Sequence, residues 1–105
     1  MKKKIRQLIK YLLPYQPERI FLFGSWARGE EDELSDMDLV VIKQTCAPFW
    51  DRLREVTALL PPEIGGIDIL VYTPDEFSAM QRNGNAFAEM ITEGARLIYD
   101  HQEKS

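Results

Sequence analysis

Two acids, Asp36 and Asp38, stand at the start of an apolar run, Leu39 to Ile42, that has the composition of a buried strand. A second apolar run, Phe21 to Phe23, precedes them. Because successive strand side chains point to opposite faces, the two carboxylates share one face, with Cα atoms about 6 to 7 Å apart. Adjacent carboxylates repel each other, so a chain that keeps both beside its core needs a positive charge to compensate them.

A third acid, Asp68, lies in the apolar run Ile67 to Tyr72. The run is typical of a fully buried strand, and we expect an isolated carboxylate there to need a partner. If this strand lies beside the one that carries Asp36 and Asp38, all three carboxylates meet on one face. They would then surround one or two hard cations, and Mg²⁺ prefers such oxygen ligands.

The turn after Phe23 supplies a candidate phosphate site. Gly24 allows the backbone to approach a ligand closely, and a helix that starts at Ser25 or Trp26 would point free N–H groups outward. The Ser25 hydroxyl can donate to a phosphate oxygen and Arg28 can neutralise one, so a triphosphate would lie between the turn and the metals. Each feature alone has a plainer interpretation, because glycine-serine pairs are commonly turns and paired strand acids are commonly exposed edge residues.

Apolar periodicity and turn residues predict the remaining elements. Thr73-Pro74-Asp75-Glu76 has the pattern of a capping box with proline at the first helical position. The last six residues, DHQEKS, are expected to fray. The pattern predicts one α+β (α/β) domain over residues 1–105, a small mixed sheet flanked by helices. The expected helices cover 5–13, 48–60, 74–82 and 86–93, and the expected strands cover 19–23, 36–43, 67–72 and 96–99.

Length and composition limit the partners. A chain of 105 residues can build one core but no separate binding domain, so a large partner must be another chain. With 45% hydrophobic and 29% charged residues and no long apolar segment, we expect a cytoplasmic protein without membrane contact. The formal net charge of -4 argues against direct binding of nucleic acid. The acidic run from Glu30 to Glu33 is interpreted as a solvated loop, or as a segment that steers a basic partner or keeps nucleic acid away.

The motif resembles that of the minimal nucleotidyltransferases of the DNA polymerase β superfamily. Their signature is Gly-Ser, ten residues and then Asp-x-Asp, often with Ala-Arg-Gly after the serine. Here Gly24-Ser25, Ala27-Arg28-Gly29 and Ser35-Asp36-Met37-Asp38 match it, with ten residues between Ser25 and Asp36. The family's third carboxylate corresponds to Asp68. The resemblance implies a polymerase-β-like nucleotidyltransferase fold over nearly the whole chain.

The resemblance also implies nucleotidyl transfer from ATP, with two Mg²⁺ ions. Asp36 and Asp38 would hold the metal that bridges the triphosphate, and Asp68 would ligate the second metal or deprotonate the attacking hydroxyl. Gly24, Ser25 and Arg28 would bind the phosphates. In-line attack on the α-phosphorus would expel pyrophosphate.

The acceptor is implied by the resemblance alone. Stand-alone members are typically encoded beside a small helical HEPN-domain protein, a ribonuclease toxin, and act as antitoxins that transfer AMP to a toxin tyrosine. An alternative is a non-catalytic antitoxin that neutralises its partner by binding alone, although Asp36, Asp38 and Asp68 would then have no purpose. Another alternative is a transferase for a small molecule such as an aminoglycoside, against which the absence of an acceptor-binding domain weighs.

Overall fold

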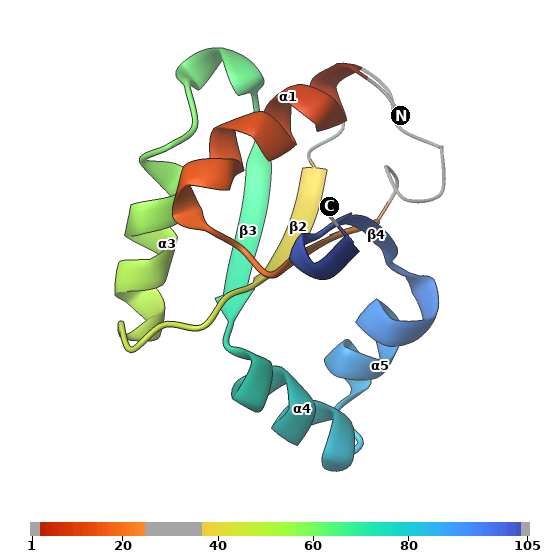
Figure 1. Cartoon of the computed structure of the whole chain (residues 1–105). Helices are drawn as coiled ribbons and strands as arrows, with labels where there is room; N and C mark the ends of the chain where they lie inside the picture. The colour runs from red at the N-terminus through yellow and green to blue at the C-terminus, as the bar shows by residue number, and fades with distance from the viewer. Residues whose placement is uncertain (1–2, 25–36, 104–105) are drawn as a thin grey trace.

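A mixed sheet forms the centre of the protein, for which the computed structural model describes residues 3–24 and 37–103. Its strands are β1 (Arg19–Phe23), β2 (Met37–Ile42), β3 (Ile67–Tyr72) and β4 (Arg96–Asp100). Their order across the sheet is β3-β2-β1-β4 (Figure 1). β1 pairs antiparallel with β2 and β4, whereas β2 and β3 are parallel. The prediction of a mixed sheet is therefore confirmed.

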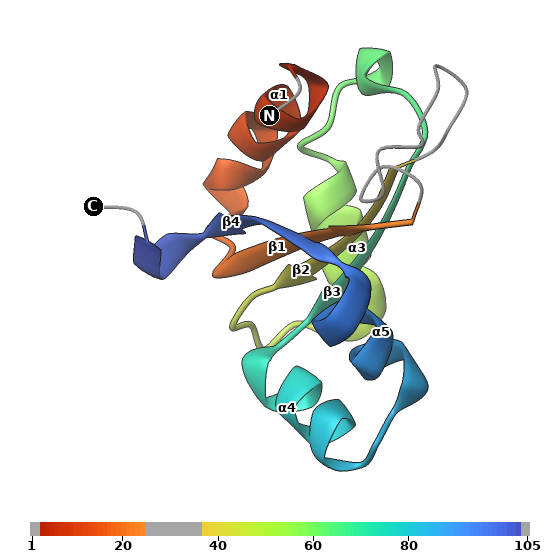
Figure 2. The same ribbon diagram turned by 90° about the vertical axis from the view of Figure 1, so that its right-hand side faces the viewer.

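Helices cover both faces of this sheet (Figure 2). The α-helices described are α1 (Lys3–Leu12), α3 (Phe49–Thr57), α4 (Pro74–Arg82) and α5 (Ala86–Gly94). One face packs against α1 and α3, and the other packs against α4 and α5. In the described part of the chain, no helix has the length and apolar character needed to cross a membrane.

β2 is the strand around which both apolar layers form. Leu39 and Val41 pack with Leu8 and Val56 in the α1/α3 cluster, while Val40 and Ile42 lie in the α4/α5 cluster. All four strand residues are fully buried. A strand buried on both faces needs apolar residues at every position, which explains the unbroken run from Leu39 to Ile42.

Several predicted boundaries differ from the structure, as at both ends of α1, which covers Lys3–Leu12 rather than 5–13. α3 ends at Thr57 rather than Leu60, because the N–H groups of Leu59 and Leu60 donate to carbonyls only three residues earlier as the chain turns toward Pro61. The prediction that the tail frays is wrong for Asp100, which ends β4, and for His101–Glu103, which form a 3-10 helix. The His101 N–H donates to the Glu18 carbonyl at 2.8 Å, so the end of β4 is fixed to the chain that leads into β1.

The predicted capping box at the start of α4 is present. Glu76 N–H donates to Thr73 Oγ1 at 3.1 Å, and Thr73 N–H donates to Glu76 Oε1 at 2.9 Å. The next helix, α5, has a similar cap, because Asn85 Oδ1 accepts from the N–H groups of Phe87 and Ala88. These caps satisfy backbone donors that would otherwise lack partners at the helix ends.

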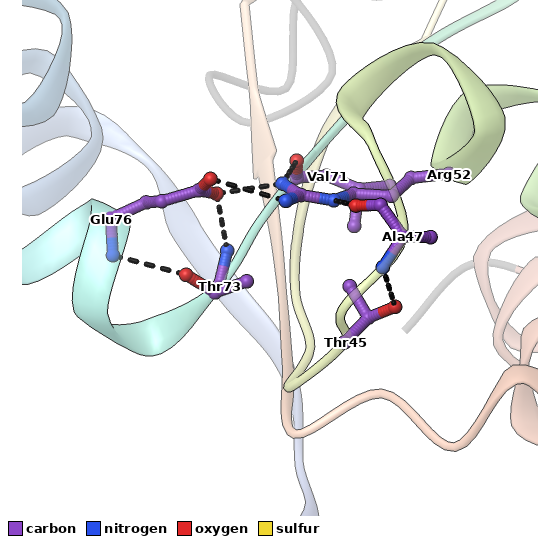
Figure 3. A network of polar contacts seen from close by, with 6 residues as sticks. All are labelled: Thr45, Ala47, Arg52, Val71, Thr73 and Glu76. Carbon is purple, nitrogen blue, oxygen red and sulfur yellow. Dashed lines mark hydrogen bonds and ion pairs between the residues drawn. The ribbon is translucent and has the colours of Figure 1, made fainter.

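The capping glutamate also forms an ion pair with a buried arginine that the sequence analysis did not single out (Figure 3). Arg52 is 6% exposed and donates from Nη1 and Nη2 to the Glu76 carboxylate at 2.6 and 3.1 Å. It also donates from Nε to the Ala47 carbonyl at 2.8 Å and from Nη1 to the Val71 carbonyl at 3.3 Å. One side chain of α3 thus connects β3, α4 and the segment before α3.

This pair is expected to contribute to stability. Glu76→Gln should lower the free energy of unfolding at pH 7 by about 2 kcal/mol, because the buried guanidinium loses its charged partner. The effect should fall below that of a fully buried pair, because the Glu76 side chain remains 44% exposed. Asp51→Asn, which removes the exposed pair with Arg54, is the control and should cost less than about 0.5 kcal/mol in urea unfolding. Equal losses in the two variants would contradict this role.

The same pair predicts a dependence on pH. The hydrogen bond from Arg52 lowers the pKa of Glu76, as do the bonds from Thr73. A carboxylate whose pKa is lower in the folded state stabilises the protein above its unfolded pKa of about 4.3, and this contribution is lost as pH falls through the folded pKa. The difference in unfolding free energy between wild type and Glu76→Gln should therefore shrink from pH 7 to pH 3. A difference independent of pH would refute the assignment.

Candidate active site

The strand register brings Asp38 and Asp68 together. The two residues are paired neighbours in the parallel β2–β3 ladder, so their Cα atoms lie about 4.8 Å apart. Asp38 shares its face of the sheet with Val40, and Asp68 shares the same face with Leu70, because side chains alternate along each strand. Both carboxylates therefore lie on the α4/α5 face, at the end of the sheet where β2 and β3 begin.

Gly24 completes this end of the sheet from the other side of β2. It follows β1 directly, and Phe23 is the cross-strand partner of Asp38. A Cβ built on Gly24 would lie 2.6 Å from Asp38 Oδ2, closer than real Cβ atoms approach an oxygen. Gly24 also has a φ of +77°, which L side chains rarely adopt. Two independent features therefore require glycine at this position: its positive φ, and the Asp38 carboxylate that occupies the space a Cβ would fill.

Aromatic packing supports β1 just before this turn. The rings of Phe23 and Phe87 meet edge to face with centroids 5.8 Å apart, and Phe87 also contacts Tyr72 at 6.3 Å. Phe87 lies in the first turn of α5, whose start is fixed by the Asn85 cap. The position of the strand end that leads into Gly24 therefore depends on α5.

Three of the predicted site residues can be placed and three cannot. Gly24, Asp38 and Asp68 lie close together, and β3 lies beside β2 as the metal hypothesis required. The predicted burial of Asp68 is wrong, because Asp68 is exposed. β3 is an edge strand, and Asp68 is its second residue. The other predicted site residues, Ser25, Arg28 and Asp36, lie outside the described residues, as does the acidic run from Glu30 to Glu33.

The donor set at this end of the sheet suits a hard divalent cation. Asp38 and Asp68 offer carboxylate oxygens from paired positions, and the missing Cβ at Gly24 leaves space for one of them. Oxygen donors of this kind are those that Mg²⁺ prefers. Within residues 3–24 and 37–103, no three acidic, histidine or cysteine side chains form a metal-binding group. The residues described therefore fit part of a magnesium site, and the remaining predicted ligand, Asp36, lies outside the described residues.

Lys4, a basic residue that was not among the predicted site residues, lies at the same end of the sheet. Lys4 Nζ lies 3.4 Å from the position that a Cβ on Gly65 would occupy, just before β3 begins. Helical periodicity shows which side of α1 faces the core, but it does not show which end of the sheet the first turn approaches. The glycine pair Gly65-Gly66 is the one available signal, because it allows a neighbouring side chain to approach the backbone.

Comparison with known proteins identifies similar chains. The family model described as "Polymerase beta, Nucleotidyltransferase" matches residues 6–104. A provisionally assigned nucleotidyltransferase from Sulfolobus solfataricus is 18% identical with a TM-score of 0.56, covering 98% of this chain and 92% of that chain. A chain of a solved toxin–antitoxin structure with AMP-PNP is 18% identical with a TM-score of 0.61, covering 95% of this chain and 73% of that one. At this identity the two structures show a shared fold. The search of curated proteins found no match.

The two requirements at Gly24 can be separated experimentally. Gly84 also has a positive φ, +68°, but a Cβ there would meet nothing within 4 Å. Gly84→Ala should therefore cost about 1 kcal/mol of unfolding free energy, from backbone strain alone. Gly24→Ala should cost about 2 to 3 kcal/mol, because its Cβ also displaces Asp38. Urea unfolding of both variants measures the difference, and equal losses would show that the Asp38 contact is unimportant.

Proposed function

Because this chain belongs to the polymerase β nucleotidyltransferase family, we propose that it transfers AMP from ATP to a tyrosine of a protein partner. The partner we propose is a HEPN-domain ribonuclease toxin, so that the chain acts as its antitoxin. The observation that carries the enzymatic part is the pairing of Asp38 with Asp68 across β2 and β3, beside Gly24. The fold shared with a toxin–antitoxin structure that contains AMP-PNP supports an adenine nucleotide and a protein partner.

The proposed reaction is an in-line substitution at the α-phosphorus of ATP. The tyrosine hydroxyl oxygen forms a bond to phosphorus, the bond from phosphorus to the oxygen bridging the α- and β-phosphates breaks, and pyrophosphate leaves with the electron pair. The hydroxyl proton passes to a carboxylate, for which Asp68 is our candidate because it is exposed on the edge strand. Mg²⁺, when bound, neutralises charge on the triphosphate and on the leaving group.

Each candidate site residue has a proposed role that follows from its position. Asp38 contributes a cation ligand from the central strand, and we propose Asp36 as its companion on the same strand. Gly24 leaves backbone space beside that carboxylate. We propose that Ser25 and Arg28 bind the phosphates from the adjoining turn.

Substitution of the paired acids tests the proposal. Wild-type protein should transfer radiolabel from α-labelled ATP to the co-purified HEPN partner in the presence of Mg²⁺. Asp38→Asn and Asp68→Asn should each lower the rate roughly a hundredfold or more, because charge stabilisation of the transition state is lost. Asp75→Asn is the matched control, since Asp75 is an exposed acid in the first turn of α4, beyond the other end of β3. The Asp75→Asn variant should transfer label at the wild-type rate, and EDTA should abolish transfer by the wild-type protein.

The distribution of label separates the alternatives. Toxin inhibition that survives Asp38→Asn without any label would refute the catalytic proposal and favour a contact antitoxin. Label that appears in a small-molecule acceptor such as an aminoglycoside, and not on the protein partner, would refute the proposed acceptor while preserving the reaction class. The circular dichroism spectrum of each variant should match that of wild type, which shows that a variant without activity is still folded.

A further inference from the structure

The last residue of β1, Phe23, is paired on one side of its strand. The pairing of β1 with β4 extends to Leu22, which faces Arg96, the first residue of β4. In the register of the described strands, Phe23 therefore faces Asp38 of β2 and no residue of β4. A strand end with a neighbour on one side has fewer hydrogen bonds to fix it, so contacts of its side chain contribute more to its position.

The ring of Phe87 provides such a contact. It meets the ring of Phe23 edge to face, with centroids 5.8 Å apart and an angle of 83° between the planes. Phe87 is fixed from two further directions. Its ring lies 6.3 Å from the ring of Tyr72, and its N–H donates to Asn85 Oδ1 at 2.9 Å in the cap of α5. The capped first turn of α5 therefore gives Phe23 a fixed surface to pack against.

A movement of Phe23 would affect the candidate site directly. Gly24 is the next residue, and the position that a Cβ would occupy there lies 2.6 Å from Asp38 Oδ2. Phe23 also lies on the same face of the sheet as Asp38, its cross-strand partner. One displacement of the strand end would change both parts of the proposed nucleotide site, which are the turn that would bind phosphate and the carboxylate that would bind Mg²⁺.

We propose that Phe87 is a positioning residue for nucleotide binding. Through its contact with Phe23, it keeps the end of β1 in the arrangement that binds ATP with Mg²⁺. Phe87 itself need not touch the nucleotide. The inference rests on the proposed function, because it takes Gly24 and Asp38 as parts of the nucleotide site.

A second aromatic pair on β1 separates this role from packing alone. Phe21 stacks on Phe77 of α4, with centroids 6.2 Å apart, and α4 and α5 cover the same face of the sheet (Figure 2). The cross-strand partner of Phe21 is the apolar Val40 rather than an acid. Phe77 is 4% exposed, whereas Phe87 is only partly buried. Phe77 therefore packs at least as well as Phe87, but against a residue two positions before the end of the strand.

The size of the expected effect follows from preorganisation. A ligand that binds one arrangement of its site has an apparent dissociation constant that rises as the fraction of protein in that arrangement falls. An edge-to-face ring pair shifts such an equilibrium by a factor of about two to ten. Loss of the Phe87 ring should therefore weaken ATP binding about fivefold, whereas saturating ATP should restore the arrangement and most of the rate.

Direct binding of ATP tests the proposal without an acceptor. Isothermal titration of the full chain with ATP and Mg²⁺ should give a dissociation constant about fivefold higher for Phe87→Leu than for wild type. Phe87→Tyr keeps the ring and should stay within about twofold of wild type. Phe77→Leu is the matched control. It should also stay within about twofold, although its midpoint of urea unfolding should fall at least as far as that of Phe87→Leu.

A double-mutant cycle tests whether Phe87 acts through Phe23. Phe23→Leu removes the same ring contact from the strand side and should also weaken ATP binding about fivefold, which preserves the test if Phe87→Leu does not fold. The double variant should bind ATP no more weakly than either single variant, because one contact can be lost only once. Losses that multiply to about 25-fold would show that the two rings act independently and would overturn the proposal.

Transfer kinetics give a second readout. With the HEPN partner as acceptor, Phe87→Leu should raise the KM for ATP about fivefold and leave kcat and the KM for the partner within about twofold. A purely structural loss would lower the amount of active enzyme and leave the KM for ATP unchanged. A KM for the partner that rises as much as the KM for ATP would contradict a role at the nucleotide site.

The outcomes distinguish the positioning role from the proposed function. Weaker ATP binding by Phe87→Leu than by Phe77→Leu, without transfer of label by wild type, would preserve the positioning role and overturn the proposed transfer. Label transfer by wild type with equal ATP affinity in the two variants would overturn the positioning role alone. Absence of ATP binding by wild type would overturn both.

Discussion

The parallel pairing of β2 with β3 is the constraint on which the candidate active site depends. Its register sets Asp38 beside Asp68, and the same register sets Leu39 beside Ile69 and Val41 beside Val71 in the apolar layer under α1 and α3. A shift of one residue would turn Asp68 toward that layer and expose Ile69. Packing of apolar side chains therefore holds the two acids together against their mutual repulsion. The geometry of the site is thus determined by the packing of the core.

Much of the sheet could be predicted because its information is local. The run from Leu39 to Ile42 has no polar residue, and a strand needs such a run only when both of its faces are covered. β2 is covered on both faces. The start of α4 was equally predictable, since Thr73 and Glu76 carry the whole capping box within four residues. The pairing of β3 with β2 was expected as a condition for a shared site, and the structure has that pairing.

What the sequence did not reveal depends on position within the sheet or on distant partners. Asp68 was expected to be buried because its neighbours are apolar, but composition does not indicate that a strand lies at the sheet edge. Arg52 stands three residues after Phe49 and four before Val56, so its spacing already placed it on the core side of α3. Its partner, Glu76, is 24 residues away, and nothing local connects the two. Lys4 and Gly65 are likewise far apart in the sequence, and nothing local connects them.

The ion pair between Arg52 and Glu76 has a consequence for how the protein comes apart. α3 belongs to one apolar layer and α4 to the other, and the pair joins them around the end of an edge strand. Neither α3 nor α4 can leave the sheet without breaking that contact, so local unfolding of either helix costs additional free energy. Amide hydrogens in the two layers should accordingly exchange through a common opening event, with similar protection on both sides of the sheet.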